Sequence, residues 1–137
     1  AMSETSSTSS DGFEVKSSIP VLRVLDEAQA KAYYIDYLGF EIDWESRFSP
    51  TAPLYMQIHL GEAILHLNGH ATESAPVSEV NIPIRGLQNY CNYLIAKGAS
   101  YPKPVPVDPR SQGRNTDLNL YDPFGNLLVF CSQRTET

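Results

Sequence analysis

One arrangement of elements occurs twice along this chain of 137 residues, and this repeat limits the folds open to the chain more than any other feature. Hydrophobic periodicity predicts a strand, a helix and three strands, and then the same order again about 60 residues later. A single unit of that size is too small to bury its own apolar faces. We therefore predict an α+β fold in which two tandem βαβββ units form one curved eight-stranded mixed sheet with the helices outside.

The repeat divides the chain into four segments. Seven of the first ten residues are Ser or Thr, so we expect residues 1–17 to form a flexible tail without apolar periodicity. The first unit is expected at 18–70, a polar linker at 71–78, and the second unit at 79–133. The expected helices are 27–38, which follows an Asp26 N-cap, and 87–97. The expected strands are 19–24, 40–45, 54–60, 63–68, 79–85, 101–107, 118–121 and 127–131, of which 101–107 carries alternate prolines and suits an edge.

The two-residue turn at Gly61-Glu62 fixes which side chains share a face, because it pairs Gln57 with His66. One face is then wholly apolar and must cover a helix: Met56, Ile58, Leu60, Ala63, Leu65 and Leu67. The opposite face is polar and aromatic: Tyr55, Gln57, His59, Ile64, His66 and Asn68. In the second unit the corresponding open face includes Glu79, Asn81, Asp117, Asn119, Tyr121, Leu127 and Val129. Two such faces that curve toward each other predict a ligand in the concavity, and a solvated face without a ligand is the alternative.

The charge balance excludes some partners. A net charge of -6 and a pI near 4.9 argue against nucleic acid and against an anionic membrane surface. They favour a neutral or cationic small molecule. The chain has no apolar run of the ~20 residues that span a bilayer and no secretory signal pattern, so we expect a cytoplasmic protein. Cys91 and Cys131 are not in a CxxC pair and are expected to be two buried thiols.

Five short segments carry a resemblance to a known family. They are Ile19–Arg23 followed by Asp26, Tyr37–Phe40, Leu54–Gln57, Leu65–Leu67 and the turn Asp122–Asn126. Together they resemble the glyoxalase / bleomycin-resistance / extradiol dioxygenase superfamily, also called the vicinal oxygen chelate superfamily, over roughly residues 18–133. The hairpin and turn segments are similar to its bleomycin-resistance-like branch. This fold hosts lyases, isomerases, dioxygenases and non-catalytic drug binders, so the resemblance predicts a fold more sharply than an activity.

The resemblance implies four positions for metal ligands: Ile19, His66, Glu79 and Val129. Ile19 and Val129 are aliphatic and carry no lone pair, whereas a catalytic metal needs at least three protein ligands. We therefore expect no cofactor and no catalytic residue. The alternative is a divalent metal held by His66 and Glu79, contributed by different chains of a dimer, in a metal-dependent lyase, isomerase or dioxygenase with a reduced ligand set.

The resemblance also implies a ligand class. Bleomycin-resistance relatives are acidic homodimers that sequester a cationic glycopeptide in grooves at the dimer interface, and their acidic–aromatic contact pair corresponds to Asp43-Trp44. The tryptophan that the family commonly carries before the last strand is missing from the segment Arg114–Asp117. Arg110 and Arg114 would repel a cation there and favour a neutral or anionic ligand.

The sequence thus predicts a homodimer that binds a small molecule, with glycopeptide or aromatic antibiotics as the leading class. A third hypothesis is a domain that binds a partner protein while its own tail fills the groove. The expected ligand-binding residues are Asp43, Trp44, Tyr55, Gln57, His66, Asn68, Asn81, Asp117 and Asn119.

Overall fold

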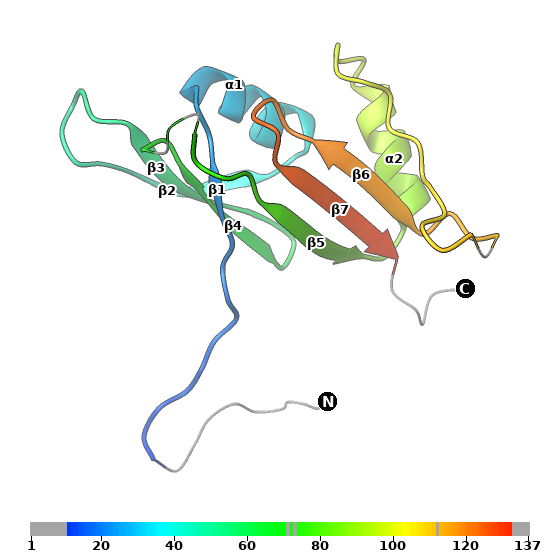
Figure 1. The fold of residues 1–137 in the computed structure, drawn as a ribbon, viewed down its shortest axis with the longest axis horizontal. Coiled ribbons are helices and arrows are strands. Elements are labelled where there is room, and N and C mark those ends of the chain that lie inside the picture. The colour runs from blue at the N-terminus through cyan, green and yellow to red at the C-terminus, as the bar shows by residue number, and fades with distance from the viewer. Residues whose placement is uncertain (1–10, 71, 73, 112, 133–137) are drawn as a thin grey trace.

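The computed structural model describes residues 11–70, 72, 74–111 and 113–132. Seven strands form two mixed sheets within these residues, in the orders β1-β4-β3-β2 and β5-β7-β6 (Figure 1). The strands of the first sheet are β1 (Val21–Arg23), β2 (Glu41–Arg47), β3 (Leu54–Leu60) and β4 (Ala63–Asn68). Those of the second are β5 (Glu79–Ile84), β6 (Asp117–Tyr121) and β7 (Leu127–Ser132). The α+β class is confirmed, but the single eight-stranded sheet is not what the structure contains.

The missing strand is the proline-rich segment 101–107. Among the described residues, it pairs with the second sheet through an isolated bridge in which Val107 and Asp117 exchange backbone hydrogen bonds of 2.7 and 3.1 Å. Prolines at positions 102, 104 and 106 fix φ at about −65°, which favours a polyproline-like extended conformation over a regular antiparallel strand. The second unit therefore has three strands around its helix among the described residues, where four were expected.

The first helical segment changes its winding along its length. It runs as α1 (Glu27–Lys31) and continues as the π-helix η1 (Ala32–Tyr37). The Asp26 carboxylate accepts a 2.8 Å hydrogen bond from the Gln29 N–H and caps the start, as expected. The wider π winding is seen in the 2.9 Å bond from the Leu38 N–H to the Tyr33 carbonyl, and the tyrosines of this segment are buried in the core.

One hydrophobic core serves both units. It joins residues of the first unit, such as Leu22 and Tyr34, to residues of the second, such as Leu118 and Phe130, in a single buried cluster. The second helix, α2 (Leu87–Ala96), packs into this core through Leu87, Cys91 and Leu94. Figure 1 shows the two sheets next to each other, with β1 and β5 in the middle of the molecule. No helix of the described residues is long and apolar enough to cross a membrane.

The remaining expectations have mixed outcomes. Residues 11–17 of the expected tail are exposed throughout, whereas residues 1–10 lie outside the described part of the chain. Cys91 is buried as expected, and its thiol lies 3.3 Å from the Pro104 carbonyl oxygen. Cys131 is only half-buried, which corrects the expectation of two buried thiols. Burial raises the pKa of both thiols above the ordinary cysteine value.

Candidate functional site

The open face of the first sheet is organised by the β3–β4 hairpin. Its register pairs Leu60 with Ala63 and Gln57 with His66, which confirms the pairing expected from the Gly61-Glu62 turn. Strand alternation then buries Met56 and Leu65 against the helix side and leaves the polar set on the other face. The polar side chains here are half-buried, so they keep access to a ligand while being held by neighbours.

An irregularity in β2 completes this face. Ile42 lies opposite Ile58, and Trp44 lies opposite Gln57, so Asp43 is an extra residue in the ladder and forms a β-bulge. In a regular strand the adjacent side chains of Asp43 and Trp44 would point to opposite faces. With the bulge, both reach the same face of the sheet: Asp43 bonds to Gln57, and Trp44 contacts Tyr55.

Six side chains form what we call the β2–β4 cluster: Asp43, Trp44, Tyr55, Gln57, His59 and His66. Four hydrogen bonds run through it. The Tyr55 hydroxyl lies 2.9 Å from His66 Nδ1, His66 Nε2 lies 2.9 Å from Gln57 Oε1, and Gln57 Nε2 donates to Asp43 Oδ2 over 2.9 Å. The fourth joins His59 Nδ1 to Asp43 Oδ1 over 2.6 Å. These bonds hold the polar groups in one connected array.

The aromatic members of the cluster form a small platform. The rings of Trp44 and Tyr55 are stacked, with centroids 6.1 Å apart and an interplanar angle of 12°. His66 meets both rings edge to face, at 5.3 Å from each. Trp44 remains 41% exposed, so its ring is available to a flat ligand as well as to its neighbours.

Asp43 carries the negative charge of the cluster. The hydrogen bond from the Gln57 amide, and then the hydrogen bond and electrostatic interaction with His59, hold the pKa of the Asp43 carboxyl below its usual range. The carboxylate is therefore ionised at neutral pH and attracts a cationic group placed over the platform.

The other expected ligand-binding residues do not join this cluster in the described chain. Asn68 shares its face, but its Oδ1 accepts a 2.9 Å bond from the His70 N–H. Asn81 and Asn119 lie on the second sheet, opposite Val129, and are exposed. Asp117 is half-buried and accepts a bond from the Thr116 hydroxyl. The nine residues thus divide into six on the first sheet and three on the second.

The four positions that the family resemblance assigns to a metal do not form a ligand set. His66 has both ring nitrogens in hydrogen bonds, and Glu79 is exposed on β5 with no bond or ion pair to His66. Ile19 and Val129 supply no donor atom. Among the described residues, no group of three His, Cys, Asp or Glu side chains is placed to hold a metal ion. The donor set present here does not fit a catalytic divalent metal.

His59 is the member of the cluster that the candidate set lacked. The turn at Gly61-Glu62 already placed the His59 side chain on the open face, so the strand register could have identified it.

Arg110 and Arg114 lie in the loop before β6 and are both exposed. Asp108 accepts hydrogen bonds from their backbone N–H groups. No hydrogen bond or ring contact joins them to the β2–β4 cluster within the described residues.

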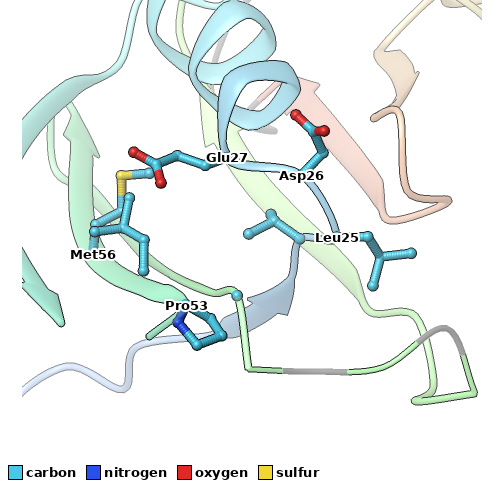
Figure 2. Close-up of a pocket in the computed structure, with 8 residues that line it drawn as sticks. Leu25, Asp26, Glu27, Pro53 and Met56 are labelled. Carbon is cyan, nitrogen blue, oxygen red and sulfur yellow. The ribbon is translucent and has the colours of Figure 1, made fainter. Parts of the chain in front are cut away.

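A separate pocket of about 230 Å³ lies on the helix side of the first sheet (Figure 2). Its walls come from the residues around the start of α1 and the start of β3: Val24, Leu25, Asp26, Glu27, Pro53, Leu54, Met56 and Gly69. Both of its carboxylates already have partners. Asp26 caps α1, and Glu27 pairs with Lys31 and Arg47, which lower the pKa of Glu27. The pocket offers a small apolar space without a free charged group.

Comparisons with known proteins bear on the fold as a whole. A family model described as glyoxalase superfamily protein matches residues 3–137. No curated protein sequence matches the chain at a significant level. Among solved structures, a bleomycin-binding protein from Streptomyces verticillus complexed with copper(II)-bleomycin is 22% identical, with a TM-score of 0.65, over 89% of this chain and 99% of that one. A bleomycin-binding protein complexed with bleomycin is 20% identical, with a TM-score of 0.62, over 88% and 100%. The fosfomycin resistance protein FosX from Listeria monocytogenes is 16% identical, with a TM-score of 0.65, over 90% and 97%.

Proposed function

This chain belongs to the glyoxalase superfamily, and from that premise we propose that it binds a small aromatic or peptide-like ligand without chemical conversion. Sequestration of a bleomycin-type antibiotic is the leading version of this function. The observation that carries the proposal is the β2–β4 cluster, in which the stacked rings of Trp44 and Tyr55 lie beside the ionised carboxylate of Asp43. A flat heterocycle with a cationic substituent can stack on the rings while its charge meets the carboxylate.

We place the groove at the interface of a homodimer. In this arrangement the β2–β4 cluster and Asn68 of one subunit face Asn81, Asp117 and Asn119 of the other. Two observations support it: no hydrogen bond joins the two sets of residues within the described chain, and β2 is an edge strand whose every residue is exposed. Light scattering during gel filtration tests the assembly, with a dimer mass expected and a monomer mass contradicting it.

Calorimetric titration with bleomycin tests the ligand. We expect micromolar or tighter binding, and we expect Trp44→Ala to weaken it by at least about tenfold, because stacking and cation–π contact with the ring are lost. Tyr93→Ala is the matched control, since Tyr93 is a similarly exposed aromatic on α2. Equal affinities of the two variants would contradict the placement of the site. The absence of binding by the unchanged protein would exclude bleomycin as the ligand.

Metal analysis separates binding from metal-dependent chemistry. The protein is purified without chelator, and its content of Ni, Zn, Fe and Mn is measured with and without His66→Ala. We expect less than stoichiometric metal in both preparations, because the donor set around His66 is incomplete. One equivalent of metal that disappears with His66→Ala would overturn the proposal and favour a metal-dependent lyase, isomerase or dioxygenase.

A further inference from the structure

The hydrogen bonds of the β2–β4 cluster have only one consistent direction. The Asp43 carboxylate can only accept, so both His59 Nδ1 and Gln57 Nε2 donate to it. The amide of Gln57 is therefore oriented with Nε2 toward Asp43 and Oε1 toward His66. Because Oε1 can only accept, the bond between it and His66 requires a proton on His66 Nε2.

The same reasoning continues to the last member of the chain. The Tyr55 hydroxyl can either donate or accept, so it adapts to whatever His66 Nδ1 presents. With the proton on Nε2, Nδ1 of the neutral ring has a lone pair, and the hydroxyl donates to it. The direction then runs without interruption from Tyr55 through His66 and Gln57 to the carboxylate.

We propose that Asp43 is a positioning residue that fixes the proton of His66 on Nε2, acting through the Gln57 amide. The β-bulge is the structural device that makes this contact, because it turns the extra residue of β2 toward Gln57 while Trp44 stays on the platform. The proposal rests on the proposed function for its relevance to a ligand. The proposal adds that the Asp43 carboxylate also determines which atoms of the β2–β4 cluster accept hydrogen bonds and which donate them.

The consequence for recognition concerns His66 directly. Both in-plane positions of its ring are occupied, one by the Tyr55 proton and one by the Gln57 oxygen. His66 therefore offers a ligand no free ring nitrogen, and the acceptors that remain for polar recognition include the Tyr55 oxygen and the Asp43 carboxylate. Both of these accept hydrogen bonds, so the cluster as ordered by Asp43 selects ligands that carry N–H or O–H donors.

Nitrogen-15 NMR of the ligand-free full chain at neutral pH tests the proposal, because one-bond correlations show which ring nitrogen carries a proton. We expect His66 to carry its proton on Nε2 alone. Asp43→Lys replaces an acceptor with a donor, so the Gln57 amide must turn its oxygen toward residue 43 and its NH₂ group toward His66. We expect the His66 proton to move to Nδ1, with the Tyr55 oxygen now accepting. Asp43→Ala removes the preference and is expected to give signals from both forms.

Two matched variants isolate the role of Asp43. Glu41→Lys makes the same charge change on the same strand, at a residue paired with His59 and without a bond to Gln57, and is expected to leave the His66 signals unchanged. His59→Ala keeps the bond between Gln57 and Asp43, so the proton of His66 is expected to stay on Nε2. Circular dichroism checks that each variant is folded. We expect the substitutions at Glu41 and Asp43 to be tolerated, because both residues lie on an exposed edge strand.

The proposal is overturned if His66 in the unchanged protein carries its proton on Nδ1, or if neither Asp43→Lys nor Asp43→Ala alters its signals. It is also overturned if Glu41→Lys changes them as much as Asp43→Lys does. None of these measurements uses a ligand. The failure of bleomycin to bind would therefore count against the proposed function and leave the NMR result to decide the role of Asp43.

Discussion

Asp122 is a buried carboxylate in the turn between β6 and β7, and its two oxygens accept four hydrogen bonds. The donors are the backbone N–H groups of Phe124 and Asn126, the Asn126 side chain and the Tyr34 hydroxyl, at 2.7–2.8 Å. Asn126 also donates to the Arg23 carbonyl. The segment Asp122–Asn126 is one of those that resemble the family, and here it ties the second unit to the first. These bonds give the segment a structural role in this chain.

Replacement of Asp122 tests that structural role. Asp122→Ala leaves the buried Tyr34 hydroxyl and the turn N–H groups without their acceptor, so we expect the free energy of unfolding to fall by about 3 kcal/mol or more. Urea unfolding monitored by circular dichroism measures the loss. Glu62→Ala, at the exposed tip of the β3–β4 hairpin, is the control and should change stability by less than about 0.5 kcal/mol. A similarly small loss for Asp122→Ala would contradict the role.

The pKa of Asp43 tests the hydrogen bonds that this carboxylate accepts from Gln57 and His59. It is lowered first by the Gln57 amide and second by His59. A carboxyl with a lowered pKa in the folded state stabilises the protein above its ordinary pKa, and that contribution is lost as the pH falls through the folded value. We expect Gln57→Leu to raise the pKa of Asp43 more than His59→Leu does. Carbon-13 NMR titration of the Asp43 carboxyl measures both. Glu27, whose pKa is lowered by Arg47 and Lys31, should titrate unchanged.

The individual elements show what the sequence could predict and where it could not. The β3 and β4 bounds and their register follow from alternation and one two-residue turn, and both are confirmed. The bulge at Asp43 could not be predicted. Every residue of β2 is exposed, so either face of this edge strand accepts the same side chains and the sequence shows no alternation that a bulge would interrupt. The strand expected at 101–107 was wrong: its alternate prolines indicated an edge strand, but within the described part of the chain the segment pairs with β6 only in an isolated bridge at Val107.

The end of η1 depends on a glycine for two separate reasons. Gly39 has φ of +96°, and a Cβ atom there would lie 2.6 Å from the Tyr93 hydroxyl of α2. Gly98, after α2, has φ of +62° and nothing within 4 Å. Gly98→Ala should therefore cost only backbone strain of about 1 kcal/mol, whereas Gly39→Ala should cost about 2–3 kcal/mol through strain and steric overlap. Thermal unfolding of both variants measures the difference, and equal losses would show that Tyr93 gives way freely.

The two units hold together across the whole molecule by more than their chain connection. The buried core is continuous between them, and the hydrogen bond from Tyr34 to Asp122 crosses from one unit to the other. The Arg23 guanidinium also donates to the Phe124 carbonyl over 2.8 Å. Each unit therefore presents to the other both apolar surface and buried polar groups, which would be exposed to water or left unpaired in isolation.

This shared interior predicts how the chain unfolds. The full chain should unfold in one transition, with equal calorimetric and van't Hoff enthalpies. Residues 1–70 and 71–137 prepared as separate fragments should show no cooperative thermal transition, because each loses the surface that covers its helix and half of the core. Mixing the fragments should restore part of the native circular dichroism, since the polar contacts at Asp122 and Asn126 can reform. A cooperative transition in residues 1–70 alone would show that the first unit has a sufficient core of its own and that the repeat consists of two independent domains.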